Sequence, residues 1–269
     1  MLLQSVCGAK RDPSVQTFGD LLQCVLNTAC TRARQAGCGV VYLVFDSYRE
    51  DDLGGGGGLK NNTWKRRHGG EHLPVYSGIT LRDKVPTGRK DGMSVFLRVA
   101  SNKRQLIALF RDNFCSLLQR TPYPPLLMYA VVSRVGFMCT EREGKWEMAP
   151  CHPVDSIFCE ADYGLLTCAV HHITASAGAC PHVVVAVEDT DVVVGLIAQF
   201  RQLQASVGVQ DPVLCVQRGK PRKIFDVGRA VARLEEMHGP CFCPVRHSQC
   251  GLARSVCVCV CVYDDIRWY

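Results

Sequence analysis

Residues Val183–Asp191, with the sequence VVVAVEDTD, restrict the fold of this 269-residue chain more than any other stretch. The first five are apolar and nearly all β-branched, which is typical of a short strand buried on both faces of a sheet. Three acids follow, and open α/β sheets usually place their functional sites beyond such carboxyl ends. In an extended chain Asp189 and Asp191 point to the same side, where a cation would relieve their repulsion. A polar strand end that enters a turn is the alternative interpretation.

A second apolar run repeats this pattern. Residues Val40–Phe45 (VVYLVF) form a predicted buried strand, and Asp46 follows directly. Leu126–Val132 is a third candidate strand and Val213–Val216 a short fourth one. Because helical segments separate these strands, the sequence predicts an α/β fold with three layers, α/β/α, around a mainly parallel central sheet. We expect Val40–Phe45 and Val183–Val187 to be adjacent and parallel.

Segments with apolar residues at helical spacing lie between the strands. The first is Gln16–Ala36, with Thr17 as its predicted N-cap. Asn102 is expected to interrupt the second, and a hairpin is expected around Gly144. Asp226 is the predicted N-cap of the last helix. The remaining helices are predicted over Ser94–Leu118, Ser156–Ala177, Val192–Leu203 and Val227–Glu236.

Positive charge is concentrated in one part of the chain. The net charge is +6, but residues 60–104 alone contain eleven Lys or Arg against three acids, an excess of eight. A basic stretch near an acidic site favours a polyanionic partner, DNA or RNA. A solvated loop or a nuclear-import signal would also explain it. The candidate phosphate contacts are Lys65, Arg66, Arg67, Lys103 and Arg104.

The distribution of low-complexity sequence suggests the domain boundaries. Residues 1–238 are predicted to form one domain, in which residues 51–92 or so are a flexible basic insertion containing five consecutive glycines. Residues 239–269 are predicted to be a degenerate tail, because Val256–Val262 alternates Val and Cys without a break. At most a short edge strand is expected there. A zinc site is the alternative for the tail, although its ligand spacing matches no recognised finger; its ligands would be Cys241, Cys243, His247 and Cys250.

The 17 cysteines are odd in number and irregular in spacing, which favours reduced thiols over a disulfide framework. No signal peptide and no apolar run of membrane-spanning length are visible in the sequence. We therefore expect an intracellular protein, nuclear or cytoplasmic, with no membrane partner. The sequence does not indicate its oligomeric state.

Five acids stand at predicted strand ends and helix starts. Asp46 ends the first strand, Glu160 and Asp162 open a helix, and Asp189 and Asp191 end the central strand. Hard divalent cations such as Mg²⁺ or Mn²⁺ prefer such oxygen ligands. Two ions held by these carboxylates would activate water and stabilise the leaving oxygen in phosphodiester hydrolysis.

The order of these motifs resembles the PIN-like superfamily of nucleases, whose flap-endonuclease branch has acids in the same order. The resemblance is closest to uncharacterised PIN-like proteins that are associated with mobile elements in fish and invertebrates. It extends over about residues 17–238 and implies a magnesium- or manganese-dependent nuclease whose metals are held by the five acids. The matching segments are VFDSY (Val44–Tyr48), CEADYG (Cys159–Gly164), EDTDVVV (Glu188–Val194) and RKIFDVGRAVARL (Arg222–Leu234).

The chain departs from this pattern in two places. Tyr163 stands where the family has a small polar residue, and after His238 no aspartate appears before Asp264, although the resemblance predicts one soon after this point. The metal site could therefore be incomplete. Two alternatives to a nuclease follow: a catalytically inactive PIN-like binding module, or a degenerate mobile-element remnant.

Overall fold

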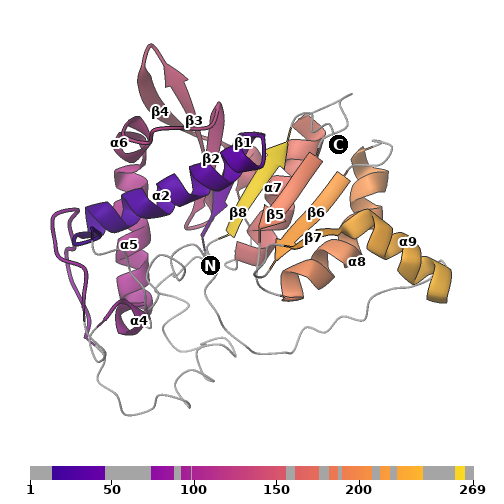
Figure 1. Cartoon of the computed structure of the whole chain (residues 1–269), viewed down its shortest axis with the longest axis horizontal. Coiled ribbons are helices and arrows are strands. Elements are labelled where there is room, and N and C mark those ends of the chain that lie inside the picture. The colour runs from indigo at the N-terminus through magenta and orange to yellow at the C-terminus, as the bar shows by residue number, and fades with distance from the viewer. Residues whose placement is uncertain are drawn as a thin grey trace.

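An eight-stranded mixed sheet runs through the computed structural model of the chain (Figure 1). The structure describes residues 14–45, 74–87, 92–97, 99–155, 161–175, 182–186, 190–207, 213–218, 223–238 and 258–263. The strands, in the order in which they lie across the sheet, are β4 (Lys145–Pro150), β3 (Val135–Arg142), β2 (Leu127–Val132), β1 (Cys38–Val44), β8 (Val258–Tyr263), β5 (His182–Ala186), β6 (Val213–Arg218) and β7 (Lys223–Asp226).

The sheet is not mainly parallel, so that prediction was wrong. Only β1–β2 and β5–β6 pair in parallel, and the other five neighbouring pairs are antiparallel. Three of the antiparallel pairs arise from hairpin connections at the two ends of the sheet, β2–β3, β3–β4 and β6–β7. Tight turns can join only antiparallel neighbours, whereas parallel pairs need a crossover helix.

Strand β8 separates β1 from β5 and accounts for the other two antiparallel pairs. The strands β1 and β5 lie in one sheet and run in the same direction, as predicted, but they are not adjacent. Cys38 of β1 and His182 of β5 both stand opposite Tyr263, so the two strands are in register through β8. Their separation is two inter-strand spacings, about 9.6 Å. The Val-Cys repeat thus forms a central strand instead of the expected edge strand.

Helix α2 (Phe18–Gln35) begins as the sequence predicts. Thr17 and Asp20 form a reciprocal capping box, in which the Thr17 N–H donates to Asp20 Oδ2 over 2.8 Å and the Asp20 N–H donates to Thr17 Oγ1 over 3.2 Å. These bonds hold the pKa of the Asp20 carboxyl below its usual value. The helix buries one apolar stripe, which includes Leu21, Leu22 and Val25.

The predicted helix over 94–118 is three shorter helices: α4 (Met93–Phe96), α5 (Ala100–Asp112) and α6 (Phe114–Gln119). Asn102 does not interrupt it. This residue lies inside α5 and is fully buried, with its side-chain amide donating to the Pro74 carbonyl and its side-chain oxygen accepting from the Tyr76 N–H. Such hydrogen bonds compensate the burial of the polar side chain.

Part of the predicted basic insertion is included in the described structure and packs against the body. Residues 74–87 are held by Asn102 at one end and by α2 at the other, where the Phe18 N–H donates to the Asp83 carbonyl and the Val85 N–H donates to the Gln16 carbonyl. Tyr76 contacts the Phe96 ring. The glycine run of the predicted insertion lies outside the described residues.

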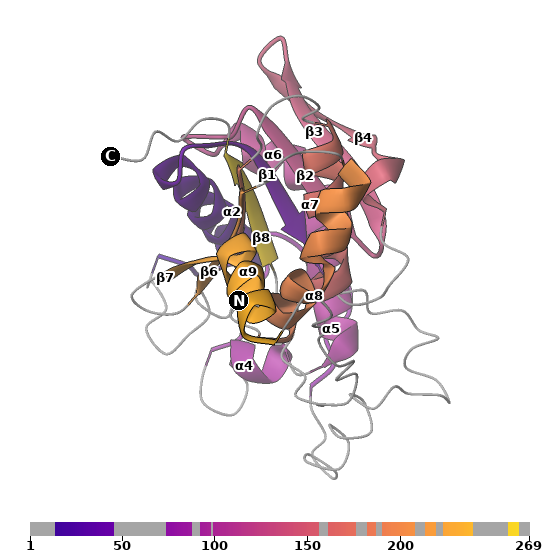
Figure 2. The ribbon, with the colours of Figure 1, turned by 90° about the vertical axis from the view of Figure 1, so that its right-hand side faces the viewer.

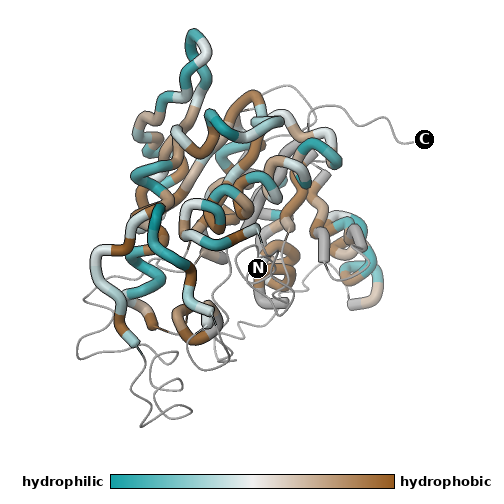
Figure 3. The backbone as a smooth tube through the Cα atoms, turned by 60° about the vertical axis from the view of Figure 1, so that its left-hand side comes forward, coloured by the Kyte–Doolittle hydropathy of each residue, from teal (hydrophilic) through white to brown (hydrophobic). Residues whose placement is uncertain are grey.

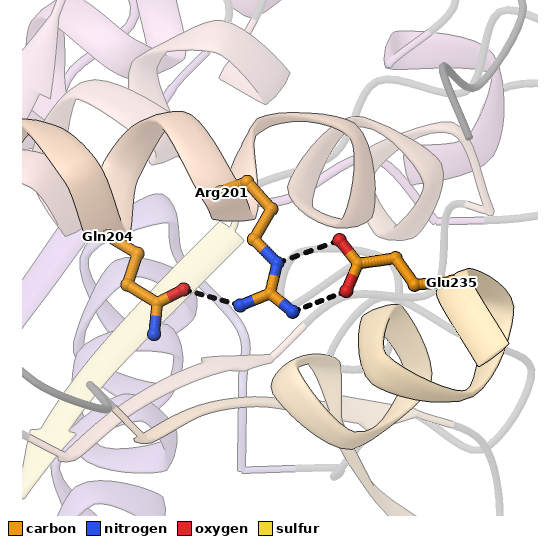
Figure 4. A network of polar contacts seen from close by, with 3 residues as sticks. All are labelled: Arg201, Gln204 and Glu235. Carbon is orange, nitrogen blue, oxygen red and sulfur yellow. Dashed lines mark hydrogen bonds and ion pairs between the residues drawn. The ribbon is translucent and has the colours of Figure 1, made fainter. Parts of the chain in front are cut away.

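The helices α2 and α5 pack on one face of the sheet. The opposite face is covered by α7 (Ala161–Ala175), α8 (Thr190–Val207) and α9 (Val227–His238). Asp226 caps α9, as predicted, by accepting the Arg229 N–H over 3.0 Å. Arg201 joins α8 to α9 (Figure 4): its Nε donates to Glu235 Oε1 over 2.9 Å, its Nη2 donates to Glu235 Oε2, and its Nη1 donates to Gln204 Oε1 over 2.7 Å.

Successive residues of the strands point to opposite faces of the sheet and pack into two separate apolar cores. In β1, Val41 and Leu43 pack with α2 and α5, whereas Tyr42 and Val44 pack with α7. Figure 2 shows α2 on one side of the sheet and α7 on the other. In Figure 3 the apolar residues gather inside, and the projecting β3–β4 hairpin is largely hydrophilic. Among the described residues, no helix is both long enough and apolar enough to cross a membrane.

Candidate functional site

The strands β1 and β5, which precede predicted metal-binding acids in the sequence, end at the same edge of the sheet. Leu43 near the end of β1 and Ala186 at the end of β5 both pair with Cys259, so the two strands end level with each other. Helix α7 leads into β5 and α8 leaves it, so both helices begin at this same edge. The two helices also pack against each other. We call this edge, where β1 and β5 end and α7 and α8 begin, the carboxyl edge.

Three of the five predicted metal-binding acids, Asp46, Glu160 and Asp189, lie outside the described residues. Asp162 and Asp191 are placed by their backbones in the first turns of α7 and α8, and their side chains are not described. No group of three or more His, Cys, Asp or Glu side chains able to hold a metal occurs within the described part of the chain. The topology therefore brings the flanking elements to one edge and leaves the carboxylates themselves unplaced.

The position of β8 changes the geometry expected for the site. Direct adjacency of β1 and β5 would place their ends about 4.8 Å apart, whereas the observed order doubles this spacing. The ends of β1 and β5 are therefore farther apart than the predicted adjacency of the two strands would place them.

Two of the predicted phosphate contacts lie in the first turns of α5. Phe45, which follows β1, packs against Phe110 of α5 with ring centroids 5.3 Å apart. Lys103 stands seven residues before Phe110, about 10 Å along the helix axis, with Arg104 beside it. Because α5 begins beyond the end of β1 (Figure 1), both residues lie on the carboxyl-edge side of the molecule. Lys65, Arg66 and Arg67 lie outside the described residues.

Asp155 is a residue at this edge that the sequence interpretation missed. It follows a short 3₁₀ helix, η1 (His152–Val154), and its carboxylate accepts the Gly136 N–H over 2.6 Å and contacts His152 Nδ1 at 3.0 Å. The bond from Gly136 is the main reason why the pKa of Asp155 is below its usual value. Gly136 stands level with the end of β1, because it pairs with Val131 and Val131 pairs with Val44. Asp155 thus fixes the chain at the carboxyl edge shortly before α7 begins.

We expect Gly136→Ala to disrupt the hydrogen bond between the Gly136 N–H and Asp155 and to destabilise the protein. An added Cβ would lie 2.4 Å from Val154 Cγ2 and 2.5 Å from the Cys151 carbonyl oxygen, so η1 would have to move. Overpacking of this kind costs about 1–3 kcal/mol of unfolding free energy. The matched control is Gly195→Ala within α8, where nothing lies within 4 Å of the added Cβ; it should stabilise the protein by about 0.5–1 kcal/mol. Urea unfolding of the two variants measures both values, and equal stabilities would contradict the close packing of η1.

The last turn of α7 is anchored by a buried tyrosine. Tyr42 stacks on Tyr129 with centroids 4.5 Å apart, and its hydroxyl lies 3.0 Å from His171 Nδ1 and 3.5 Å from His172 Nδ1. Burial raises the pKa of Tyr42 and lowers that of His171, so neutral forms are favoured in both side chains. Through these contacts the two histidines fix α7 against β1.

Comparison of the chain with known family models, with characterised proteins and with solved structures found no match. Function must therefore be inferred from the topology of the sheet and from the order of the acidic motifs.

Proposed function

We propose that the chain is a PIN-like, three-layer α/β/α nuclease that hydrolyses phosphodiester bonds in DNA or RNA with the help of Mg²⁺ or Mn²⁺. One observation carries the proposal: β1 and β5 end, and α7 and α8 begin, at the same edge of one sheet. These are the four elements that the five acids follow or open in the sequence. Acids in three separate sequence segments, each adjoining an element that begins or ends at this edge, are a stronger indication of a site than any single acid.

The donor set fits a hard divalent cation, because all five proposed ligands are carboxylates. Asp46, Glu160 and Asp189 would hold the metal, with Asp162 and Asp191 at the rim of the site. Bound metal would supply an activated water and charge stabilisation at the phosphate. The protein would contribute the fixed spacing between the ends of β1 and β5. This spacing would set the distance between the two points at which the segments with Asp46 and Asp189 leave the sheet.

The proposed partner is a nucleic acid, and its support is the basic charge on the same side. Lys103 and Arg104 lie in the first turns of α5, beyond the end of β1. The excess of eight positive charges over residues 60–104 would attract a phosphate backbone. Lys65, Arg66 and Arg67 would add further phosphate contacts.

A catalytically inactive binding module is the second candidate, and the position of β8 favours it. With β8 between β1 and β5, the two strand ends are farther apart than adjacent strands would be. A site widened in this way would retain its affinity for nucleic acid through the basic residues but would lose the spacing that hydrolysis needs. A degenerate mobile-element remnant is the third candidate, supported by the glycine run Gly54–Gly58 and by the Val-Cys repeat of the tail.

The test is hydrolysis and binding by the purified chain. Labelled single-stranded and duplex DNA and RNA are incubated with Mg²⁺, with Mn²⁺ or with EDTA, and binding is measured in parallel by fluorescence anisotropy. A nuclease should cleave at least one substrate with metal and none with EDTA. Binding without cleavage in either metal would favour the inactive module, and neither binding nor cleavage would reject both functions.

A further inference from the structure

Two thiols from separate elements meet between α6 and the sheet. Cys115 lies in the first turn of α6 and Cys139 in the middle of β3, and their side chains hydrogen-bond to each other. Both are free thiols. They are far from the carboxyl edge, because Cys139 pairs with Met128 near the start of β2.

The elements that carry the two thiols are fixed by their surroundings. Cys139 is fully buried on the face of the sheet that packs against α2, α5 and α6. Cys115 is partly exposed, and the helix that carries it is anchored by the buried side chains of Phe114, Leu117 and Leu118. A disulfide requires thiols that can approach each other, and side chains that already hydrogen-bond to each other meet this requirement.

We propose that Cys115 and Cys139 form an oxidisable pair, which closes to a disulfide between α6 and β3 on reaction with a small-molecule disulfide such as oxidised glutathione. The inference does not depend on the proposed nuclease function. A metal site is not the explanation of this pair, since no third metal-ligating side chain joins them among the described residues.

The reaction is two thiol–disulfide exchanges. In the first, the Cys115 thiolate attacks one sulfur of oxidised glutathione, forms a mixed disulfide and releases one glutathione thiolate. In the second, the Cys139 thiolate attacks the Cys115 sulfur, forms the Cys115–Cys139 bond and releases the second glutathione thiolate. The two protons lost by the protein thiols are taken up by the two released thiolates. The protein is oxidised by two electrons, and glutathione disulfide is reduced by two.

Exposure and protonation assign different roles to the two thiols. Cys115 is the more exposed of the two residues and so attacks first, whereas the buried Cys139 resolves the mixed disulfide. Burial raises the pKa of the Cys115 thiol, and the hydrogen bond with Cys139 opposes that rise. Burial also raises the pKa of Cys139, so little thiolate forms near pH 7 and the exchange should be slow and faster at higher pH.

The disulfide would close a loop of 25 residues, from 115 to 139. This loop contains β2, the strand beside β1, so the bond would tie the β2–β3 part of the sheet to its covering helix. Because a loop of this length restricts the unfolded chain, the melting temperature of the oxidised protein should rise by roughly 5–10 °C.

The test uses the full chain, reduced and then incubated with oxidised glutathione at pH 8.5. Free thiols are then alkylated, and the digest is searched for a peptide pair joined through Cys115 and Cys139. That pair and the rise in melting temperature should be found in the wild type and in the control Cys215→Ala, and dithiothreitol should reverse both. Cys215 is a suitable control because it is also buried but lies in β6.

Two variants make the outcome decisive. Cys115→Ser and Cys139→Ala should each lose the joined peptides and the oxidation-induced rise. Cys115→Ser changes a partly exposed side chain, so it keeps the test informative should Cys139→Ala fail to fold. Alkylated Cys115 and Cys139 in the treated wild-type protein, or a dominant bond from either thiol to a different cysteine, would overturn the proposal.

Discussion

Asp189→Asn should lose metal-dependent cleavage by more than about 100-fold, because replacing even an outer partner of a metal ligand typically costs 10–100-fold. The same substitution should remove the stabilisation that metal gives to the fold. A cation that binds only the folded state adds about 2.7 kcal/mol at a concentration of 100 times its Kd. For a chain of this size that is a rise in melting temperature of roughly 5–10 °C. Cleavage rates and thermal melting, each with and without Mn²⁺, measure both losses.

The matched control for this experiment is Glu143→Gln. This substitution also removes one negative charge. Glu143, however, lies in the exposed β3–β4 turn, which follows the end of β3, whereas Gly136 lies near the start of that strand. It should retain both the metal-induced shift and the cleavage of the wild type. Equal metal-induced shifts in Asp189→Asn and in the wild type would show that Asp189 does not bind the metal, and the carboxyl edge would then have no defined role.

Val260→Pro should lower the melting temperature by roughly 6–12 °C, since proline within an element costs about 3 kcal/mol or more and each kcal/mol corresponds to 2–4 °C here. Val260 stands opposite Tyr42 of β1 and Val185 of β5, in the middle of β8. Proline removes the N–H that a central strand needs on one side, and its ring disturbs the pairing on both. Differential scanning calorimetry measures the loss.

Val260→Ala separates the backbone effect from the side-chain effect, because alanine keeps the N–H. It should lose clearly less stability than Val260→Pro. A proline variant as stable as the alanine variant would mean that β8 does not occupy the middle of the sheet, and β1 and β5 would then be free to pair directly.

Local patterns in the sequence were enough to predict most individual elements. The Thr17–Asp20 pair defines the start of α2, and Asp226 that of α9, because a capping side chain and its helix are close in sequence. The strands β1, β2 and β5 are runs of β-branched and other apolar residues. The breaks between α4, α5 and α6 were missed because the sequence from Met93 to Gln119 contains no Gly or Pro to mark them.

These local patterns could not predict the order of the strands across the sheet. A strict Val-Cys alternation fits any register and either face of a sheet equally well, so nothing in it indicates a position between β1 and β5. The carboxyl edge was foreseen from chain direction alone, because strands that run the same way end together. Asp155 was missed because its partner Gly136 is 19 residues away and no acidic pattern includes it.

The central position of β8 also has a consequence for the time course of folding. Its first pair with β1 joins Val44 to Val258, so this contact spans 214 residues of chain. Closing such distant contacts slows folding. During synthesis the strands of the β2–β1 and β5–β6 pairs leave the ribosome before residues 258–263. Until β8 has been released, β1 and β5 each keep one unpaired strand edge. In that interval the nascent chain presents two apolar edges, and its dependence on chaperones should be greatest then.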